Sequence, residues 1–349
     1  MTTRQSSAPR KPLNLEHTPT DLVVPIEGLA PCTVLLKLEG MNAAGSIKLK
    51  TAVQILDDLE ISQQIAPGAR LIESSSGNLG VAIAMLSAAR GYHFTCVTDP
   101  NASALAVGKM KALGADVICV TTRDETCNYL KTRLSLIKRM CEDDPDLVWL
   151  NQYGNPSNWR AHYFTTAPEI LSVCPNVEYL FVGAGTTGTV MGCARYFRQY
   201  APSVVIVAVD ALGSVTFGSP PGRRHIPGIG ASHKPEIADA SLVDELVLVD
   251  EREAILMCRA LAARGLPIGG STGSVLSAVS RMSHRFRPGT AVVAISPDMG
   301  DKYLDTIYDD GWVKQHYPEV LLQGLTDQER SISRSASTRE RIQIEGNTP

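Results

Sequence analysis

Long hydrophobic runs are missing from this sequence of 349 residues. The longest apolar stretches, such as 204–209, are far too short to cross a bilayer. The first residues, 1–12, are polar and basic and lack the apolar core of a secretory signal. Because 33 lysines and arginines nearly balance 36 aspartates and glutamates, no strong field attracts nucleic acid or an anionic membrane. We therefore expect a cytoplasmic protein that binds neither nucleic acid nor a membrane.

The eight cysteines form no CxxC pair and are scattered along the chain. We interpret them as reduced thiols in a reducing compartment. None of the seven histidines has zinc-ligand spacing to cysteines or carboxylates, so we predict no metal site. Apolar residues make up 44% and charged residues 20% of the chain, which is ordinary for a globular protein. The length suits one large or two moderate α/β domains.

Short β-branched runs alternate with amphipathic segments through most of the chain. Candidate strands occupy residues 34–38, 70–74, 93–97, 116–120, 179–183, 204–210, 245–249 and 291–296. Candidate helices occupy residues 46–59, 78–90, 103–113, 124–140, 159–171, 187–200, 252–264 and 273–284. Apolar strands that alternate with helices predict mostly parallel sheet, covered by helices on both faces.

Three stretches interrupt this alternation. Residues 143–157 are rich in Asp, Pro and Asn and predict the seam between two sheets. Residues 212–233 form a long Gly, Pro and basic segment without periodicity, and loops of that length are often functional. Residues 326–349 are polar, with a Ser/Arg run, and we expect a disordered tail.

The first notable turn, 42–50, follows a predicted strand and opens a predicted helix. Ser46 is a candidate N-cap, which places Lys48 in the first helical turn. The positive end of the helix dipole disfavours a cation there, so the field lowers the pKa of the Lys48 amine. The neutral amine is the form that Schiff-base chemistry needs. A surface lysine at a helix start is the simpler interpretation of this turn taken alone.

The second turn contains Ser75, Ser76 and Gly77 and precedes the predicted helix 78–90. Hydroxyls and free backbone N–H groups at a helix N-terminus suit a carboxylate or a phosphate. The side-chain amide of Asn78 can donate to a phenolic or carbonyl oxygen. A serine-rich capping turn without a ligand is an equally good interpretation of this segment alone.

The third turn, 183–189, also lies between a predicted strand and a predicted helix. Its successive N–H groups and threonine hydroxyls suit a phosphate at the helix N-terminus. The string is also a literal GxGxxG, and Asp210 ends the next strand, which is the fingerprint of a dinucleotide-binding unit. That alternative, an NAD-dependent oxidoreductase, leaves the first two turns without a role. A threonine-rich loop also suits a terminal phosphate better than a closely approached pyrophosphate.

A fourth turn, 269–274, again precedes a predicted helix. Its Ser271 is either a capping residue, the simpler interpretation, or a neutral hydroxyl that faces a ligand. A neutral hydroxyl beside a heteroaromatic ring nitrogen leaves that nitrogen unprotonated, so the electron sink is moderate. Such a sink suits elimination and replacement at a β-carbon.

With these turns in order, the chain resembles the fold-type II pyridoxal 5′-phosphate (PLP) enzymes of the cysteine synthase/cystathionine β-synthase family. The resemblance covers about 17–308, most of the chain. Each motif is weak alone, whereas all of them in this order are specific. The motifs are His-Thr-Pro at 17–19, Lys-Leu-Glu-Gly at 37–40, Gly-Ser-Ile-Lys at 45–48, Ser-Gly-Asn at 76–78, Gly-Thr-Thr-Gly-Thr at 185–189, Gly-Ile-Gly at 228–230, Gly-Gly-Ser-Thr-Gly at 269–273 and Gly-Asp-Lys-Tyr-Leu at 300–304.

The resemblance implies a Schiff base between PLP and Lys48, which also shuttles protons. The implied cofactor contacts are Asn78 at the 3′-oxygen, Ser271 at the ring nitrogen and, at the phosphate, Gly185, Thr186, Thr187, Gly188 and Thr189. Ser75, Ser76 and Gly77 would hold the α-carboxylate of an amino-acid substrate.

The resemblance also implies an α/β fold with two three-layer αβα domains of mostly parallel sheet, like the tryptophan synthase β chain. The expected parts are a flexible N-terminus (1–14), a smaller αβ domain (45–150), a larger cofactor-binding αβ domain (15–44 with 151–325) and the tail (326–349). Members of the family are usually homodimers, so we expect a homodimer.

Three departures from the ordinary cysteine synthase pattern are informative. The segment 43–50 lacks the Pro and the Asp-Arg pair of the usual Pro-Gly-Gly-Ser-Val-Lys-Asp-Arg motif, Thr187 replaces a glycine, and Tyr153 stands where phenylalanine is common. These changes resemble the branch that makes 2,3-diaminopropionate precursors for siderophores and peptide antibiotics. That branch joins O-phospho-L-serine to L-glutamate by β-replacement, giving N-(1-amino-1-carboxy-2-ethyl)-L-glutamate and phosphate.

A phosphate leaving group and a dicarboxylate both need cationic or hydroxyl partners. Arg223 and Arg224, in the long loop, and Tyr153 are the predicted substrate-binding residues. A solvated basic loop is the alternative for the arginine pair. The main alternative function is a sulfide-using cysteine synthase with O-acetylserine or O-phosphoserine as first substrate, and a non-catalytic sensor is a further one. The nucleophile, the downstream product, the oligomeric state and the role of the tail stay open at this point.

Overall fold

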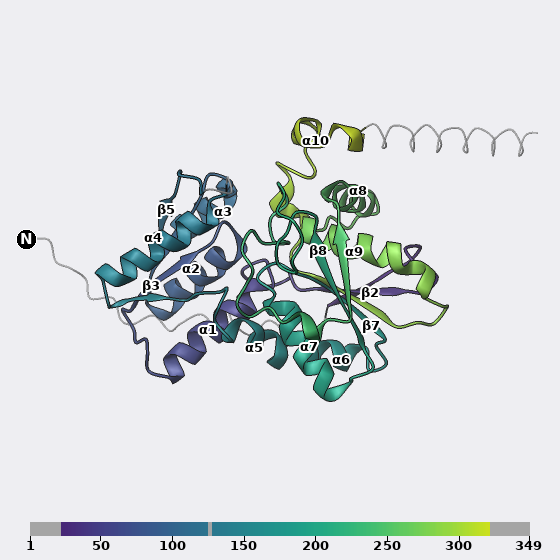
Figure 1. Ribbon diagram of the computed structural model, residues 1–349, viewed down its shortest axis with the longest axis horizontal. Helices are drawn as coiled ribbons and strands as arrows, with labels where there is room; N and C mark the ends of the chain where they lie inside the picture. The colour runs from purple at the N-terminus through teal and green to yellow at the C-terminus, as the bar shows by residue number, and fades with distance from the viewer. Residues whose placement is uncertain (1–21, 125–127, 322–349) are drawn as a thin grey trace, which may run out of the picture.

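The computed structural model describes residues 22–124 and 128–321, which form two mainly parallel β-sheets flanked by helices (Figure 1). Among these residues the larger sheet has the strand order β1 (Val23–Ile26), β2 (Val34–Leu38), β10 (Val292–Ser296), β7 (Tyr179–Gly183), β8 (Val205–Ala211) and β9 (Glu245–Val249). The smaller sheet has the order β5 (Asp116–Cys119), β4 (His93–Thr98), β3 (Arg70–Ser74) and β6 (Leu147–Trp149). Only the β1–β2 pair of the described strands is antiparallel.

Helices cover both faces of each sheet. They are α1 (Lys48–Ile61), α2 (Asn78–Arg90), α3 (Ala104–Ala112), α4 (Leu130–Asp143), α5 (Ser157–Phe164), α6 (Thr166–Val173), α7 (Gly188–Tyr200), α8 (Glu251–Ala262), α9 (Gly270–Met282) and α10 (Asp310–His316). Alternate residues of β7 face opposite layers, because Phe181 joins the core of α8 and α9 and Leu180 joins the core of α6 and α7. The smaller sheet likewise has one core towards α1, α2 and α3 and another towards α4. The predicted fold class, two three-layer αβα units, is confirmed.

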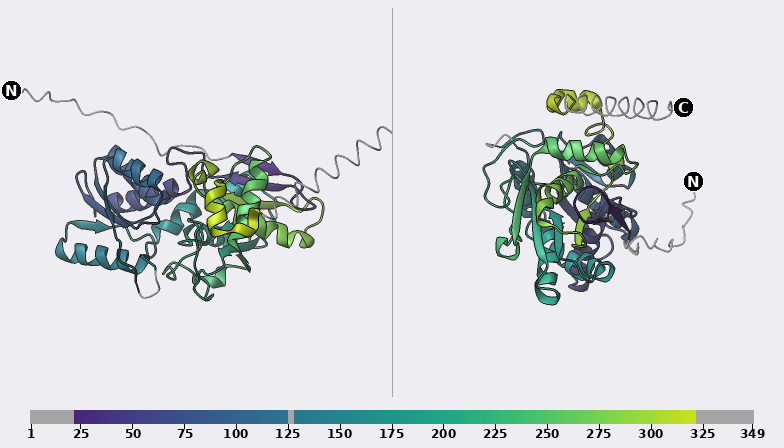
Figure 2. Two further views of the ribbon diagram at one scale, coloured as in Figure 1. Left: turned by 90° about the horizontal axis from the view of Figure 1, so that it is seen from above. Right: turned by 90° about the vertical axis from the view of Figure 1, so that its right-hand side faces the viewer.

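All the predicted strands are present, and β2, β3, β7 and β9 have the predicted bounds. Figure 2 shows from above that the smaller unit, in blue, lies beside the larger one, in green and yellow. The partition of the strands follows the predicted division at about residue 150, while the domain bounds themselves stay a prediction. The expected loop 212–233 contains no helix or strand.

Several predicted elements need correction. The sequence patterns missed β1, β6 and α10. The predicted helix 159–171 is two helices, α5 and α6, because Pro168 cannot donate to the carbonyl of Phe164 and its ring would clash with that carbonyl. At the break, Thr165 adopts φ −124° and ψ −73°. The next predicted helix upstream, 124–140, begins only at Leu130.

The start of α1 also differs from the prediction. Ser46 does not cap the helix, since Ile47 precedes Lys48 and α1 has no side-chain cap. The backbone of Ser46 instead forms a β-bridge with Asp298, and its Oγ is buried without a hydrogen-bond partner among the described residues. Similarly, Gly270 begins α9, so the turn 269–274 supplies the first helical turn and does not precede the helix.

Some predictions lie outside the described residues. These are the flexible N-terminus 1–14, the His-Thr-Pro motif at 17–19 and the tail 326–349. Within the described ranges, no helix combines the length and the apolar character needed to cross a membrane.

The candidate site residues follow the carboxyl ends of parallel strands. The loop 75–77 follows β3, the loop 184–187 follows β7, and Asp298 follows β10. In open α/β sheets, ligands bind beyond these strand ends, where backbone N–H groups and helix N-termini converge. The fold therefore gathers turns that are far apart in the sequence.

Candidate active site

Lys48 begins α1 on a braced loop. The side chain of Asn42 accepts from the backbone N–H groups of Ala44 (3.1 Å) and Ser46 (3.4 Å), and its Nδ2 donates to the carbonyl of Ser46 (2.9 Å). The N–H of Ile47 donates to the carbonyl of Pro297 at 2.8 Å, which ties the loop to the end of β10. These bonds fix the position from which the Lys48 side chain projects.

The Lys48 amine has an altered acidity. Burial lowers its pKa to about 8, and the negative charge of Asp298 acts in the opposite direction. The sequence predicted a lowered pKa from the helix dipole, whereas desolvation is the main cause in the structure. A substantial fraction of the amine is therefore neutral near pH 7, as a Schiff-base lysine requires.

Asn78 is held between a carboxylate and an ammonium. Its Nδ2 donates to Asp298 Oδ2 at 2.7 Å, and its Oδ1 accepts from Lys302 Nζ at 2.6 Å. Tyr303 OH also donates to Asp298 Oδ2 (2.8 Å), and Lys302 Nζ also donates to the carbonyl of Gly45 (2.6 Å). This arrangement fixes which end of the amide is the donor and leaves the second Nδ2 hydrogen for a ligand oxygen.

Asp298 is a residue that the sequence patterns missed. It is buried, and its Oδ1 has no hydrogen-bond partner in the described part of the chain. Burial raises the pKa of its carboxyl, while the charge of Lys302 lowers it. A Cβ on Gly269 would lie 1.9 Å from Asp298 Oδ1, so only glycine fits there. The neighbouring motif at 300–304 was the only signal in the sequence.

The loop after β7 has the properties of a phosphate site. Thr187 adopts a left-handed φ of 67°, and its Oγ1 is buried without a hydrogen-bond partner among the described residues. The hydroxyls of Thr186 and Thr189 flank it near the N-terminus of α7, and all three threonines are buried. A Cβ on Gly188 would meet Asn158 Oδ1 at 2.0 Å, which explains the glycine. The Thr187 hydroxyl, without a partner in the described ranges, and the helix N-terminus together suit an anion.

Glycines connect this loop to Ser271. A Cβ on Gly185 would lie 3.0 Å from the carbonyl oxygen of Gly228, and one on Gly228 would lie 3.9 Å from Ser271 Oγ. Gly228 adopts φ 89°, in the left-handed region that favours glycine. Ser271 is buried in the first turn of α9. The structure thus brings the predicted phosphate loop and the predicted partner of the ring nitrogen to one place.

Part of the second predicted turn, the Ser75 hydroxyl, stabilises the turn itself through local hydrogen bonds. Ser75 Oγ accepts from the N–H groups of Gly77 (3.3 Å) and Gly80 (2.9 Å), so this hydroxyl braces the start of α2. Its proton is still available for donation. A Cβ on Gly77 would meet nothing within 4 Å, so there is open space beside the turn. Ser76 and Gly77 are half-buried there and can offer polar groups to a carboxylate.

The predicted arginine pair does not act together. Arg224 is half-buried, and it donates to the carbonyl of Ile229 (3.2 Å) and to Ser232 Oγ (3.0 Å). Burial lowers the pKa of its guanidinium, and Tyr153 is one of the groups that oppose this effect. Arg223, in contrast, is exposed. Of the pair, Arg224 is therefore the one whose charge acts on Tyr153.

A second missed residue, Arg133 of α4, also acts electrostatically on Tyr153. It is buried, and neither its Nε nor its Nη1 has a hydrogen-bond partner among the described residues, although Asp99 Oδ2 lies 3.4 Å from Nε. Burial raises the pKa of Tyr153, and the charge of Arg133 lowers it. Burial also raises the pKa of Glu73 to about 7, with Arg133 among the opposing groups. No local pattern marks Arg133, because it falls inside an ordinary amphipathic helix.

Asp210 does not fit the dinucleotide alternative. It is fully buried, and its carboxylate accepts from the backbone N–H of Ala211 at 2.8 Å. Ser214 and Arg224 also lower the pKa of this carboxyl, against the larger effect of burial. A carboxylate for a ribose needs to face a ligand groove.

The fold, the turns and the lysine define a PLP enzyme. Residues 13–298 match the family model described as "Pyridoxal-phosphate dependent enzyme", and the chain belongs to this family. The residues fit the cofactor, since they supply a lysine amine with a lowered pKa, an oriented amide and, at a helix N-terminus, the Thr187 hydroxyl without a partner among the described residues. This confirms PLP as the cofactor and an enzymatic role for the chain.

Two curated relatives share one name, N-(2-amino-2-carboxyethyl)-L-glutamate synthase. The protein from Ralstonia nicotianae is 42% identical over 282 residues, which are 80% of this chain and 83% of the relative. The protein from Cupriavidus metallidurans is 40% identical over 306 residues, which are 86% of this chain and 89% of the relative. These matches confirm the predicted resemblance to the diaminopropionate-precursor branch.

Solved structures give the same fold. O-ureido-L-serine synthase superposes with a TM-score of 0.75 at 29% identity, covering 84% of this chain and 95% of that one. A hydrogen sulfide-producing enzyme from Fusobacterium nucleatum superposes with a TM-score of 0.76 at 28% identity, covering 81% of this chain and 96% of that one.

Proposed function

We propose that this enzyme joins O-phospho-L-serine to L-glutamate by β-replacement, giving N-(1-amino-1-carboxy-2-ethyl)-L-glutamate and inorganic phosphate. The observation that carries this proposal is the similarity to two synthases named for this product, over at least 80% of the chain. In the reaction the Cβ–O bond to phosphate breaks and a Cβ–N bond to the glutamate amine forms. The product would serve as a precursor of 2,3-diaminopropionate in siderophore or peptide-antibiotic biosynthesis.

Lys48 is the proposed catalytic base and acid. When bound, PLP withdraws electron density from the substrate α-carbon and so acidifies its proton. The neutral Lys48 amine then takes this proton and returns it after the new bond has formed. The lowered pKa of about 8 supports this role, because base and acid forms are both accessible near neutral pH.

The proposed binding roles follow the placement of polar groups. Asn78, oriented by Asp298 and Lys302, donates to the 3′-oxygen of the cofactor. Ser271 faces the ring nitrogen. The phosphate lies against the loop residues Gly185, Thr186, Thr187, Gly188 and Thr189. The substrate α-carboxylate binds the turn of Ser75, Ser76 and Gly77.

Arg133 supports a dicarboxylate as the second substrate. A buried guanidinium with orphaned N–H groups is costly unless a ligand completes its hydrogen bonds. Glutamate offers a side-chain carboxylate, which matches the planar fork of arginine. Sulfide offers no such group. Arg224 and Tyr153 are the proposed contacts for the phosphate leaving group. For Arg223 we propose no direct contact, only a positive charge at the edge of the site.

The test offers O-phospho-L-serine with L-glutamate and with sulfide in separate reactions, followed by mass spectrometry and a phosphate assay. The proposal expects the glutamate adduct together with one phosphate per adduct. Cysteine from the sulfide reaction, with no adduct from the other, would instead establish a cysteine synthase. Lys48→Ala is expected to abolish both the adduct and the covalent PLP–protein product that borohydride reduction traps in the wild type.

We further propose a cytoplasmic homodimer that takes small amino acids as substrates. The proposed domains are 45–150 for the smaller one and 15–44 with 151–325 for the larger one, in line with the partition of the strands. Limited proteolysis at the 143–157 seam and light scattering test the division and the oligomeric state.

A further inference from the structure

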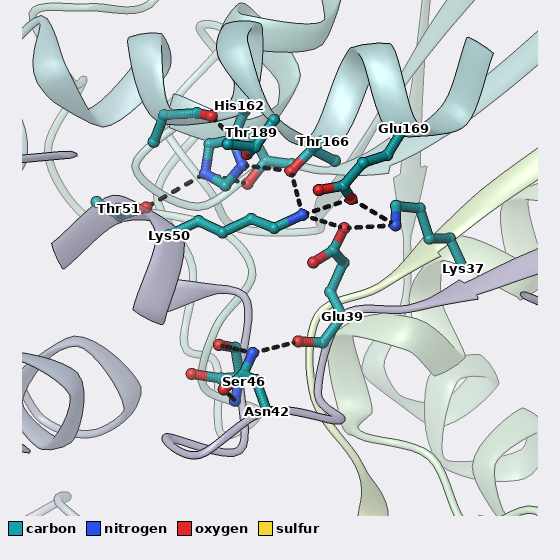
Figure 3. Close-up of polar contacts among 12 residues, drawn as sticks. Lys37, Glu39, Asn42, Ser46, Lys50, Thr51, His162, Thr166, Glu169 and Thr189 are labelled. Atoms are coloured by element: carbon teal, nitrogen blue, oxygen red, sulfur yellow. Dashed lines mark hydrogen bonds and ion pairs between the residues drawn. The ribbon is translucent and has the colours of Figure 1, made fainter. Parts of the chain in front are cut away.

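A buried ion cluster lies behind the proposed phosphate loop. Lys50 Nζ is 3.0 Å from Glu39 Oε1 and 2.7 Å from Glu169 Oε2, and Lys37 Nζ is 3.2 Å and 2.8 Å from the same two oxygens. Lys37 and Glu39 are fully buried. Lys50 Nζ also lies 3.3 Å from Thr166 Oγ1, as Figure 3 shows. The two cations and two anions balance, and the Thr166 hydroxyl connects the cluster to α6.

That hydroxyl leads to a buried histidine. His162 Nδ1 lies 3.0 Å from Thr166 Oγ1, and His162 Nε2 lies 3.2 Å from Thr51 Oγ1 and 3.3 Å from Thr189 Oγ1 (Figure 3). Burial lowers the pKa of His162 well below its ordinary value, and the charges of Lys48 and Lys50 lower it further. The imidazole is therefore neutral and carries a single N–H.

The chain of contacts continues to the phosphate loop. Thr51 Oγ1 donates to Asn158 Oδ1 at 3.4 Å. Asn158 Nδ2 donates to the carbonyl of Gln152 at 2.7 Å, which fixes the orientation of the amide, and to Thr186 Oγ1 at 3.1 Å. This series of hydrogen bonds therefore reaches Thr186 through Asn158 and Thr189 through His162.

Lys50 determines which group donates and which accepts along this series of hydrogen bonds. An ammonium only donates, so Thr166 Oγ1 accepts from Lys50 and keeps its own proton to donate. We assign the tautomer in which this proton is donated to His162 Nδ1. The ring proton then lies on Nε2 and points to Thr51 and Thr189. Each hydroxyl that accepts from the preceding group has its own proton left to donate onward, and such chains strengthen their members.

We propose that Lys50, Thr166 and His162 are positioning residues that orient the hydroxyl of Thr189 as a donor to the cofactor phosphate, while Asn158, held by the carbonyl of Gln152, does the same for Thr186. This inference rests on the proposed placement of the phosphate at 185–189. A phosphate dianion accepts and does not donate, so a hydroxyl presented with its lone pairs outward would repel it. The ion cluster thus determines which way a hydroxyl hydrogen of the loop points, although the cluster does not contact the cofactor.

The test compares the affinity of the apoenzyme for PLP with its affinity for pyridoxal, which lacks the phosphate. In Thr166→Val, the dissociation constant for PLP is expected to rise about tenfold, as for loss of one hydrogen bond to a charged group, with that for pyridoxal within about twofold. Thr166→Ser keeps the hydroxyl and is expected to restore the ratio. Thr165→Val is the matched control, because Thr165, at the end of α5, donates its hydroxyl to the carbonyl of Ala161 at 2.6 Å, away from His162 Nδ1 and Lys50.

Thr189→Val separates this inference from the proposed phosphate placement. Loss of PLP selectivity in both Thr189→Val and Thr166→Val supports the inference. Loss in Thr189→Val alone overturns it and leaves the placement intact, whereas no selective loss in either overturns both. Equal weakening of PLP and pyridoxal in Thr166→Val, matched by Thr165→Val, means a purely structural role and also overturns it. If Thr166→Val does not fold, His162→Phe keeps a ring but removes the N–H that faces Thr189 Oγ1, and it is expected to give the same selective loss.

Discussion

Asp298→Asn is expected to lower the pKa of the Lys48 amine further below its value of about 8. Burial disfavours the charged amine, and the negative charge of Asp298 is the contribution that opposes it. Asparagine keeps an oxygen that accepts from Asn78 and Tyr303, so the charge is the main property removed. The sign is therefore fixed, because removing an anion destabilises the protonated amine.

The magnitude follows from the fraction of neutral amine. At pH 7 a pKa of about 8 leaves roughly one-tenth of Lys48 neutral, whereas the ordinary value of 10.5 leaves about 0.03%, a difference of about 300-fold. Asp298→Asn is expected to raise the neutral fraction above one-tenth. The rate at which a small acylating reagent labels Lys48 in the apoenzyme reports this fraction directly.

The assay follows labelling against pH by peptide mass spectrometry, with the exposed Lys314 as internal reference. Asp301→Asn removes an exposed charge close by in the sequence and is the matched control, expected to leave the Lys48 midpoint unchanged. A wild-type Lys48 midpoint at or above that of Lys314 would refute the burial argument. A midpoint that rises in Asp298→Asn would refute the electrostatic one.

Three further substitutions test the geometry of the site. Gly188→Ala places a Cβ 2.0 Å from Asn158 Oδ1, so we expect weaker PLP binding and about 1–3 kcal/mol of destabilisation in urea unfolding. The control is Gly108→Ala, where a Cβ meets nothing within 4 Å, and it is expected to be neutral or stabilising. Arg133→Met is expected to raise the KM for L-glutamate about tenfold or more while the first step, phosphate release from O-phospho-L-serine, continues; equal loss of both would contradict the assignment. Arg224→Ala is expected to raise the KM for O-phospho-L-serine with the cofactor still bound, and unchanged kinetics would remove Arg224 from the site.

Local patterns predicted the strands that carry their own signal. β2, β3, β7 and β9 are short β-branched or apolar runs bounded by turn residues, and their bounds follow from the sequence. β6 has only three residues inside a stretch rich in Asp, Pro and Asn, and it is a strand because it pairs with β3. β1 contains Pro25 and forms an antiparallel edge. Such strands depend on tertiary pairing, which a local window does not contain.

The residues of the candidate site also fall into those that local sequence patterns reveal and those that depend on the fold. Its turns are contiguous, so the loops 75–77 and 185–189 are visible as strings. Asp298 acts on Asn78, which lies 220 residues earlier, and the orphaned N–H groups of Arg133 exist only because the fold buries them. Sequence patterns therefore predict where a cofactor is held more easily than which charges tune it.

The departures from the ordinary cysteine synthase motif do not all bear on substrate choice. Leu49, in place of the usual Asp, is buried in the core of α1 and α2. Lys50, in place of the usual Arg, has three N–H donors for three acceptors, on Glu39, Glu169 and Thr166. Both changes are satisfied by internal contacts away from the substrate. We therefore expect selectivity between glutamate and sulfide to come from the side of the site where Tyr153 and Arg133 interact, since Arg133 has two buried nitrogens without a hydrogen-bond partner among the described residues.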